Sequence, residues 1–516
     1  MEIKFGTGGV RGVMGDAPGC INSQVIRRVT QGLAEYILLS DAPRSAGVAY
    51  DTRHNSEEFA QAVCDVLSAF GIEVYVFNKP MPTPALSYAI RSMSLGWGVV
   101  ITASHNPQEY NGYKVYDKNG VQVTDQTAAG ILASINALDE SGQIPEKQQE
   151  LIGTFDTKIE EEYFKQIISF VTTSYALPYS LAPYPFVYSA LHGAGANAVP
   201  IVLERLGFSP ICIQQNPDGA FGGLKTPNPE EPVVYEKALA EAEKTGAKQL
   251  LATDPDCDRV GVMAKTGNGF EMLSGNQIGA LLIDYLAQTR GVNKGDTVIS
   301  TIVSGQLGEL VSRDYGLEFV RLLTGFKYIG EFIVNLPENK RFFFGYEESY
   351  GFLAGDGARD KDAVIASALI VKMAAYYEEK GKTLFDRLDE LSDKHGYCQE
   401  SLHSVEASQD KQKEIMDRQR SGNAVKCVEG TVPMTSSRVE DYLPGLNGLP
   451  PSDVIKLYFA NTGNKLYNNA WAAIRPSGTE PKLKLYTGVH ADTLEKAQES
   501  LCILKNELLN AIGETL

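Results

Sequence analysis

Three short, largely apolar runs in this sequence each end abruptly in a loop of polar residues. The runs and the loops that follow them are 98–101 with 102–107, 250–253 with 254–259, and 341–344 with 345–351. Runs of this length, bounded by turn residues, predict buried strands. Open α/β sheets bind their ligands beside the carboxyl ends of their strands, so we expect a functional site at these three loops.

Strand-like and helix-like segments alternate along the chain. Near the N-terminus, a strand at 48–50, a helix at 57–70 and a strand at 73–77 give the β-α-β rhythm of a layered α/β domain. Further on we expect a helix over 363–380, three strands over 453–459, 466–475 and 482–486, and a closing helix from Asp492. The apolar face predicted for that last helix is Leu494, Ala497, Leu501, Leu504 and Leu508.

The length of 516 residues predicts roughly three or four domains. A segment rich in Pro, Ser and Tyr at 174–185 and the sequence Asn293-Lys294-Gly295-Asp296 indicate two boundaries. The charged segment 409–422 indicates a solvated helix of the last domain or the link into it. We therefore expect domains over 1–180, 181–295, 296–405 and 406–516.

Charge and cysteine content exclude several classes of protein. The net charge of −17 argues against a nucleic-acid partner, although a few convergent cations can still bind a small anion. The seven cysteines form no CxxC pair and are odd in number, which argues against zinc and against a disulfide framework. Neither an apolar signal core nor a stretch long enough to span a membrane is present, so we expect no membrane partner and a cytoplasmic location.

The loop 102–107 carries a serine, Ser104, before the turn signal Asn106-Pro107. A serine at a turn often has no chemical role. Lys114, ten residues further on, could neutralise a phosphate, or exchange a proton if its pKa is lowered. His105 is not expected to act as a base for Ser104, because adjacent side chains diverge on an extended segment.

The loop 254–259 carries three carboxylates at alternate positions, Asp254, Asp256 and Asp258. Alternate residues of an extended segment point the same way, so the three would converge. Clustered carboxylates repel one another unless a cation joins them, and oxygen ligands favour Mg²⁺. A calcium loop of the EF-hand type is excluded, because Arg259 and Lys265 occupy the positions that need Gly and Glu. The alternative is a solvated acidic turn.

Three further loops combine residues that bind small anions or sugars. Residues 4–12 hold four glycines and Arg11, and residues 475–481 hold Arg475, Ser477, Gly478 and Thr479, so both suit a phosphate. Glu347 and Ser349 can accept from and donate to adjacent hydroxyls. The alternatives are a flexible terminus, a tight hairpin turn and an acidic turn. Residues 192–198 match a dinucleotide fingerprint, but 212–216 lack the acidic residue that a nicotinamide site needs.

The segment Thr102–Pro107 with Tyr110–Lys114 resembles the active-site signature of the α-D-phosphohexomutase family, which includes phosphoglucomutases and phosphomannomutases. Similar words occur in the family's order along nearly the whole chain, at 4–12, 191–193, 217–219, 227–230, 254–259, 324–327, 345–351 and 475–481. The chain departs from the family's pattern at Gly8, where Ser is usual, and at Tyr346 and Tyr350, which flank the third loop. The Glu-Glu-Ser form of that loop resembles the glucose-preferring members.

The resemblance implies a fold of four domains. Three related α/β layered domains with mixed sheets precede a smaller α+β C-terminal domain, and the active site lies in the central cleft. It also implies that Ser104 carries a phosphoryl group, that Arg11 faces it, and that His105 and Lys114 lie beside it. Asp254, Asp256 and Asp258 would hold Mg²⁺ together with the phosphate on Ser104. The implied substrate contacts are Arg259, Lys327, Glu347, Ser349, Arg475, Ser477, Gly478 and Thr479.

The activity that the resemblance implies is the interconversion of a hexose 1-phosphate and its 6-phosphate, glucose phosphate above all. A hexose 1,6-bisphosphate would be intermediate and activator, the last domain would open on a hinge near 400–425, and the protein would be a monomer or small homo-oligomer. Mannose, dual-specificity or pentose phosphomutases are alternatives. So are a phosphomonoesterase, which would lose its phosphoserine to water, and a silent sugar-phosphate binding protein, although the latter would be expected to lack Ser104 or an aspartate.

Overall fold

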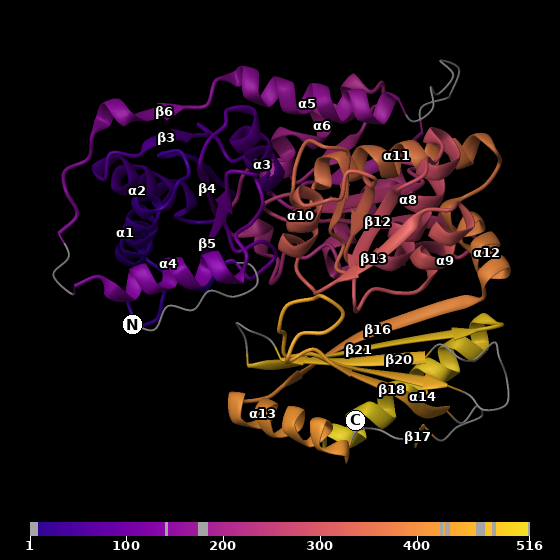
Figure 1. Cartoon of the computed structure of the whole chain (residues 1–516). Helices are drawn as coiled ribbons and strands as arrows, with labels where there is room; N and C mark the ends of the chain where they lie inside the picture. The colour runs from indigo at the N-terminus through magenta and orange to yellow at the C-terminus, as the bar shows by residue number, and fades with distance from the viewer. Residues whose placement is uncertain are drawn as a thin grey trace. The chain divides into compact units, whose positions relative to one another are not determined.

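The computed structural model describes residues 9–139, 143–173, 184–423, 427–428, 434–460, 470–476 and 481–513. The chain divides into two compact units, residues 1–300 with 316–320 and 325–385, and residues 301–315 with 321–324 and 386–516. The described residues form four sheets, and helices alternate with the strands of the first three (Figure 1). None of the described helices combines the length and apolar character that crossing a membrane requires.

The first sheet has the strand order β1-β5-β4-β2-β3-β6. Its strands are β1 (Val10–Val13), β2 (Ser45–Tyr50), β3 (Glu73–Val76), β4 (Trp97–Ile101), β5 (Tyr110–Asp117) and β6 (Ile152–Thr154). Strands β4, β2, β3 and β6 pair in parallel, and β5 is antiparallel to β4 and β1. The mixed sheet agrees with the expected layered domain.

Helices cover both faces of the first sheet. They are α1 (Ser23–Leu39), α2 (Ser56–Ala69), α3 (Thr83–Ser92), α4 (Asp125–Ala137) and α5 (Thr157–Thr172). The side chains of α1, α2 and α4 share one buried core with the sheet. On the other face, Gly47 and Gly98 let α3 approach closely, since a Cβ on Gly98 would lie 2.3 Å from Ile90.

The second sheet, β11-β10-β9-β7-β8, also mixes strand directions. It comprises β7 (Phe186–Ser189), β8 (Ile211–Ile213), β9 (Gln249–Thr253), β10 (Val260–Thr266) and β11 (Gly269–Leu273). Strand β7 is parallel to β8 and β9, and the hairpins β9-β10 and β10-β11 are antiparallel. The helices of this region are α6 (Val199–Arg205), α7 (Glu236–Thr245) and α8 (Gly275–Arg290).

The third sheet has the order β13-β12-β14-β15. Its strands are β12 (Asp296–Thr301), β13 (Glu318–Leu322), β14 (Arg341–Tyr346) and β15 (Phe352–Ala354), and its helices are α9 (Leu307–Asp314), α10 (Phe326–Val334), α11 (Ala363–Glu379) and α12 (Leu384–His395). Strands β12 and β14 are parallel, so the loops after them leave the same edge of the sheet. That edge carries the loop 345–351.

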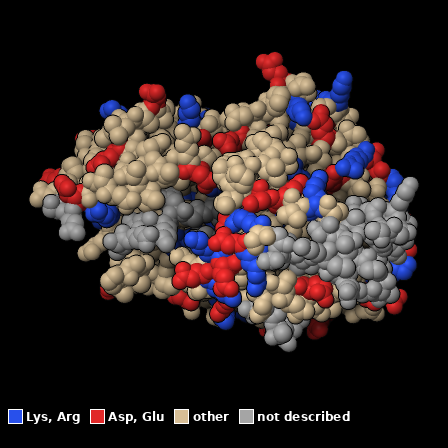
Figure 2. All heavy atoms as spheres, turned by 60° about the horizontal axis from the view of Figure 1, so that its bottom comes forward, with Lys and Arg blue, Asp and Glu red and all other residues tan. Residues whose placement is uncertain are grey.

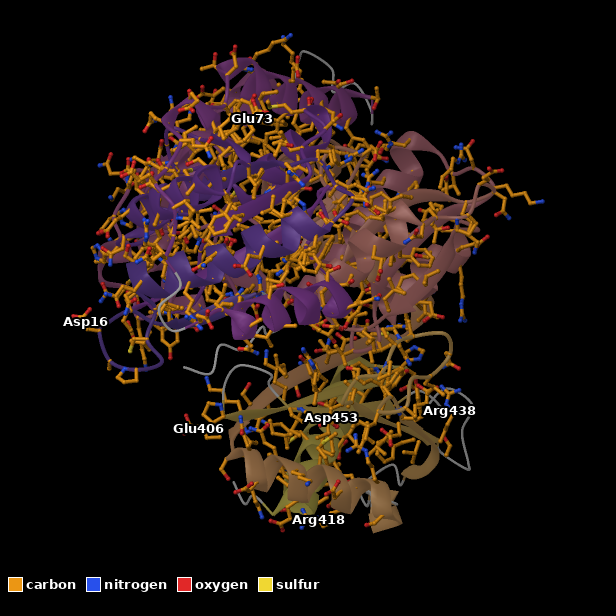
Figure 3. The ribbon with its side chains drawn as sticks, turned by 60° about the vertical axis from the view of Figure 1, so that its left-hand side comes forward. Asp16, Glu73, Glu406, Arg418, Arg438 and Asp453 are labelled. Atoms are coloured by element: carbon orange, nitrogen blue, oxygen red, sulfur yellow. The ribbon has the colours of Figure 1, made fainter. Side chains whose placement is uncertain are left out.

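The C-terminal sheet, β16-β21-β20-β19-β18-β17, is antiparallel wherever its pairing is described. It contains β16 (Tyr397–Glu406), β17 (Cys427–Val428), β18 (Met434–Asp441), β19 (Ile455–Ala460), β20 (Ala470–Pro476) and β21 (Lys482–Ala491), and its helices are α13 (Gln409–Arg418) and α14 (Leu494–Ile512). Figure 3 labels Glu406, Arg418, Arg438 and Asp453 on this part of the chain. The expected α+β organisation is confirmed here.

The apolar face predicted for α14 is partly wrong. Ala497, Leu504 and Leu508 are buried as expected, together with Leu509 and Ile512, whereas Leu494 is 42% exposed. Leu501 is partly buried against the same core, and Leu494 is the first residue of the helix. On the face of the molecule drawn in Figure 2, acidic and basic side chains are interspersed.

Helix α11 begins at a buried carboxylate, Asp362, that caps it. One carboxylate oxygen accepts the N–H groups of Val364 and Ile365, and the other accepts the hydroxyl of Tyr163 at 3.0 Å. Burial raises the pKa of Asp362 to about 6. A raised acid pKa means that the folded chain holds this proton more tightly than the unfolded chain, so stability from this group falls as the pH rises through 6.

Asp362→Asn should remove that pH dependence while keeping the cap, because the amide oxygen can accept the same N–H groups. Between pH 5 and pH 8 the wild type should lose about 1 kcal/mol relative to the variant. Melting temperatures of the two proteins across this range measure the effect. A constant difference between them would show that Asp362 is ionised throughout.

Candidate active site

Strand β4 delivers Ser104 to a buried position at the edge of the first sheet. The Ser104 hydroxyl donates to the carboxylate of Asp254 at 2.8 Å, although the two residues lie 150 positions apart. The Ser104 N–H donates to the Thr102 hydroxyl at 2.8 Å. The backbone at Ser104 is left-handed, with a φ of 54°, rather than extended. The His105 side chain therefore does not diverge as predicted, and its Nδ1 lies 3.2 Å from the Ser104 hydroxyl.

Arg53 holds the serine loop through its main chain. One guanidinium nitrogen donates to the carbonyls of Pro107 and Tyr110, and the other donates to the carbonyls of Ser104 and Asn106. Arg53 is itself held by Asp51, whose other contacts include the Thr102 hydroxyl at 2.6 Å. Because β2 and β4 are parallel neighbours, Asp51 and Arg53 leave the sheet beside the serine loop.

Arg53→Lys should lower kcat/KM by about a hundredfold, because a lysine keeps the charge beside Asp51 but cannot reach four carbonyls with one planar group. Arg91→Met is a matched control, since Arg91 also donates to main-chain carbonyls, those of Asp356 and Gly357, at the molecular surface. Steady-state kinetics of both variants test this. Equal activity in Arg53→Lys and wild type would show that the serine loop does not need the planar guanidinium group.

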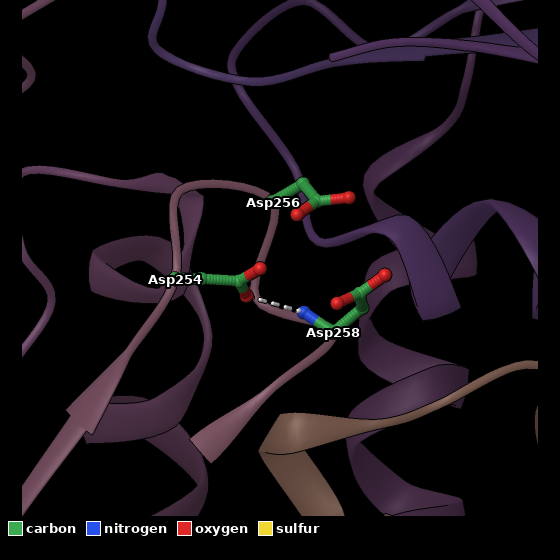
Figure 4. Close-up of side chains that lie close together, drawn as sticks. All are labelled: Asp254, Asp256 and Asp258. Carbon is green, nitrogen blue, oxygen red and sulfur yellow. Dashed lines mark hydrogen bonds between the residues drawn. The ribbon is translucent and has the colours of Figure 1, made fainter. Parts of the chain in front are cut away.

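A tight turn after β9 brings Asp254, Asp256 and Asp258 together (Figure 4). One oxygen from each carboxylate lies within 4.8 Å of the others, so the predicted convergence is confirmed. The predicted reason is wrong, because the segment is a turn and not extended. Cys257 has a φ of 52°, and the N–H groups of Asp258 and Arg259 both donate to the Asp254 carboxylate.

Two ammonium groups neighbour this aspartate cluster. Lys114 donates to Asp256 at 2.7 Å and to Asp258 at 3.0 Å, and Lys361 lies 3.1 Å from Asp258. Burial, followed by repulsion from Asp258 and Asp256, raises the pKa of Asp254 well above its ordinary value. Burial also opposes ionisation of Asp258, but Lys114, Lys361 and Arg259 outweigh it and lower the pKa of that carboxyl.

The aspartate cluster has unused capacity for a cation. Oδ1 of Asp256 and Oδ1 of Asp258 are buried and have no hydrogen-bond partner. Oxygens of this kind are costly to bury unless a positive ligand compensates them. Three carboxylates with two unsatisfied oxygens match the hard oxygen ligands of a divalent ion. The residues present therefore fit a metal, as the sequence predicts.

The pKa of Lys114 does not favour proton exchange. Burial lowers the pKa, but Asp256 and Asp258 outweigh burial and raise it above the ordinary value of a lysine. The condition under which Lys114 could exchange a proton, a lowered pKa, is not met in the protein described here. Its contacts suit charge neutralisation at Asp256 and Asp258.

Glycines at 193 and 195 let a neighbouring loop support the aspartate turn. A Cβ on Gly193 would lie 2.6 Å from the main chain of Pro255, and one on Gly195 would lie 2.6 Å from the hydroxyl of Thr253. The Ala194 N–H donates to the carbonyl of Pro255 at 2.7 Å. The segment that resembles a dinucleotide fingerprint therefore packs against the aspartate turn.

Arg259 joins the aspartate turn to the loop 345–351. It forms a β-bridge with Gly351, and its Nη1 donates to Glu230 at 3.0 Å. Burial lowers the pKa of Arg259, but Glu230 and Asp258 outweigh burial and raise the pKa above the ordinary value of an arginine. The carboxylate of Glu347 is buried and accepts the N–H of Gly325 at 2.8 Å. Ser349 is half-buried in the same loop.

The remaining predicted residues are less closely grouped. Arg11 lies on β1, and its Nη1 is 3.4 Å from the amide oxygen of Asn106 in the serine loop. Lys327 lies in the first turn of α10 and donates to Asp125 at 2.6 Å. Arg475 is on β20, in the second unit. Ser477, Gly478 and Thr479 lie outside the described residues.

Several residues of the site were not predicted from the sequence. Besides Arg53 and Asp51, they are Thr83, which donates to Asp256 at 2.8 Å, Lys361 and Glu230. A signal existed for the first two, because Asp51-Thr52-Arg53 follows a predicted strand and could have been read as a fourth polar loop. Thr83 and Lys361 have no such signal, since they belong to a helix start and to a loop before α11.

Sequence models of one family match four successive parts of the chain. They are domains I, II and III of phosphoglucomutase/phosphomannomutase, each described as alpha/beta/alpha, over residues 2–142, 161–267 and 274–395, and the C-terminal domain of the same family over residues 406–500. The order of these domains agrees with the fold predicted from the sequence.

Curated proteins and solved structures agree with that match. Phosphoglucomutases of Staphylococcus haemolyticus and Staphylococcus epidermidis are both 36% identical, covering 97% and 95% of this chain and 92% and 91% of their own. A phosphoglucomutase/phosphomannomutase family protein from Burkholderia thailandensis has the same fold at 18% identity, with a TM-score of 0.73 over 99% of this chain and 98% of its own. The pp63/parafusin phosphoglucomutase of Paramecium gives 0.72 at 16% identity, covering 99% and 94%.

The family's models match all four domains, and the identity to curated relatives exceeds one third over nearly the whole chain. The buried serine, the aspartate turn and the loop at Glu347 stand in the parts of the chain that these matches cover. The protein is an enzyme of the phosphomutase class of isomerases, and the chain belongs to the phosphoglucomutase/phosphomannomutase family.

Proposed function

We propose that this enzyme interconverts glucose 1-phosphate and glucose 6-phosphate through a phosphorylated Ser104. The relatives that cover nearly the whole chain are phosphoglucomutases. The observation that carries the proposal is the Ser104 hydroxyl, 2.8 Å from Asp254 in a buried cluster with capacity for a cation. A serine in that position can carry a phosphoryl group whose charge is balanced locally.

In the first half of the reaction, the bond between phosphorus and the Ser104 oxygen breaks, and a bond forms to a hydroxyl oxygen of the sugar phosphate. The product is a hexose 1,6-bisphosphate and an unmodified Ser104. The sugar hydroxyl loses its proton, and the serine hydroxyl gains one. In the second half, the other phosphate of the bisphosphate returns to Ser104, so the enzyme is regenerated.

Asp254, Asp256 and Asp258, with the phosphate on Ser104, would hold Mg²⁺. When bound, the ion would offset the charge of the transferring group, which is the main requirement of phosphoryl transfer. Lys114, whose ammonium donates to the Asp256 carboxylate at 2.7 Å, contributes a second positive charge. Arg259 binds phosphate from the opposite end of the turn, and Arg11 does so from β1.

The sugar is recognised by Glu347 and Ser349, which take the 3- and 4-hydroxyls. The bisphosphate must bind in two orientations, and both can present that pair of hydroxyls to the same loop. Arg475, Ser477, Gly478 and Thr479 hold the phosphate that is not transferred. Since glucose and mannose differ only at carbon 2, a loop that reads the 3- and 4-hydroxyls discriminates poorly between them, and turnover of mannose phosphates is expected as well.

We place the reaction in the cytoplasm, because Cys20, Cys64, Cys212, Cys257, Cys398 and Cys502 are unpaired thiols. The three boundaries between the four domains, after residues 180, 295 and 405, are part of the proposal, as is a monomer or small homo-oligomer as the working form.

The proposal is tested by mass spectrometry of the purified enzyme before and after substrate. Peptide mapping should find a phosphate on Ser104, and stoichiometric glucose 1-phosphate should remove it while hexose 1,6-bisphosphate appears. Release of inorganic phosphate without glucose 6-phosphate would make the enzyme a phosphomonoesterase. Phosphate that stays on Ser104 in the presence of every sugar phosphate tried would overturn the transfer mechanism.

A further inference from the structure

Lys327, the lysine proposed to contact the substrate, is held by an aspartate from a distant part of the chain. Asp125 is the first residue of α4, and one of its carboxylate oxygens accepts from the Lys327 ammonium at 2.6 Å. Its other oxygen accepts from the hydroxyl of Tyr328, also at 2.6 Å. A carboxylate that uses both oxygens on consecutive residues fixes their side chains relative to each other.

We propose that Asp125 is a positioning residue that fixes the Lys327 ammonium for an anionic oxygen of the sugar phosphate. This inference rests on the proposed function, because it needs Lys327 to meet the substrate. Asp125 itself need not touch the sugar, so it is not a catalytic residue.

The segment that carries Lys327 is held from two sides. Before the lysine, the Gly325 N–H donates to the Glu347 carboxylate at 2.8 Å, which ties the segment to the sugar loop. After it, Tyr328 donates to Asp125, and the Lys327 ammonium lies 5.1 Å from the centre of the Tyr328 ring. The lysine therefore stands between the proposed sugar contact and the start of α4.

Burial makes a fixed ammonium valuable at this position. The Lys327 side chain is 3% exposed, whereas that of Asp125 is 64% exposed. Asp125 can stay ionised at little cost because water still reaches it, and it supplies a charge partner that the buried lysine needs. Burial raises the pKa of Asp125, but hydrogen bonds from Lys327 and Tyr328 outweigh burial and lower it.

The pair also leaves capacity for a ligand. An ammonium has three N–H groups, and Asp125 accepts from one of them. A carboxylate that takes one N–H and holds the nitrogen still lowers the entropy lost when an anion binds to another. The opposite arrangement, in which Asp125 competes with the substrate for the ammonium, predicts the opposite kinetic result.

Asp125→Ala should raise KM for glucose 1-phosphate about tenfold and change kcat by less than about twofold, since the loss concerns binding of a group remote from the transferred phosphoryl. Tyr328→Phe removes only the second contact and should raise KM about twofold. Melting temperatures of both variants show whether the fold is intact.

Two further variants separate the contact with Lys327 from the charge at the helix N-terminus. Asp125→Ala combined with Gln126→Glu restores an acidic residue in the first turn of α4, at an exposed position, without the carboxylate on Lys327. KM should stay high in this double variant. Asp125→Ala added to Lys327→Ala should raise KM no further than Lys327→Ala alone.

A lower KM in Asp125→Ala would overturn the inference in favour of competition, and an unchanged KM would overturn it outright. Recovery of KM by Gln126→Glu would assign the effect to the helix and also overturn it. Additive effects of the Asp125 and Lys327 variants would do the same. If the wild type itself fails to convert glucose 1-phosphate, the proposed function fails instead, and the two failures are thereby distinguished.

Discussion

Ser104→Ala should abolish turnover of glucose 1-phosphate, with a loss of at least about ten-thousandfold in kcat, because the hydroxyl is the group that carries the phosphoryl between the two halves of the reaction. The variant should also purify without the phosphate that the wild type carries. A coupled assay for glucose 6-phosphate and intact-mass measurement check both results.

Ser68→Ala is the matched control. Ser68 is a fully buried serine of α2 in the same domain, and its hydroxyl donates to the carbonyl of Asp65 at 3.1 Å. Wild-type activity is expected there. Residual turnover of Ser104→Ala above about one hundredth of wild type would mean that another group carries the phosphoryl, and the assignment of Ser104 would be wrong.

Asp256→Asn should lower kcat about a thousandfold and remove the response to added Mg²⁺. The amide keeps the size of the side chain, and its oxygen can still accept from Thr83 and Lys114, but the change removes one of three anionic ligands and one of the two negative charges that Lys114 contacts. Titration of activity with Mg²⁺ measures the first effect. The second readout is thermal: Mg²⁺ should raise the melting temperature of the wild type and leave that of the variant unchanged.

Asp65→Asn serves as the control for the loss of a carboxylate, because Asp65 lies in α2, outside the aspartate turn, and pairs with Lys147 at 3.2 Å. It should titrate with Mg²⁺ like the wild type. Should Asp256→Asn keep the wild-type response to Mg²⁺ in both assays, the aspartate turn is not the metal site.

The strands could be predicted from the sequence, and the side chains they deliver followed from them. β4, β9 and β14 all appear where apolar runs meet polar loops, and Ser104, Asp254 and Glu347 leave their ends as expected. Local pattern suffices for this, because a buried strand needs an apolar run and its end needs turn residues. The family resemblance then gave the order of the four domains.

The conformations of the loops could not be predicted. Ser104 and Cys257 both adopt a left-handed backbone conformation. Neither is a glycine, so the residue type does not predict this conformation. The prediction that Asp254, Asp256 and Asp258 converge was right because a tight turn and an extended strand both bring alternate residues together. The prediction that the side chains of Ser104 and His105 diverge was wrong, because adjacent side chains diverge on an extended segment but not at the left-handed backbone of Ser104.

Residues that act across domains also escaped prediction. Thr83, Lys361 and Asp125 lie outside the motifs, and their contacts with Asp256, Asp258 and Lys327 depend on how separate sheets pack. Hydrophobic periodicity and motif spacing do not predict contacts of this kind.

Within the serine loop, Arg53 donates to main-chain oxygens, and every amino acid has one. Its hold on the serine loop is therefore indifferent to which side chains the loop displays. A cysteine at position 104 would be held at the same place as the serine, whereas a β-branched threonine would be strained by the left-handed backbone there. Because the loop is held by its main chain, we expect Ser104 to keep its place between the two halves of the reaction, so that the bisphosphate reorients instead.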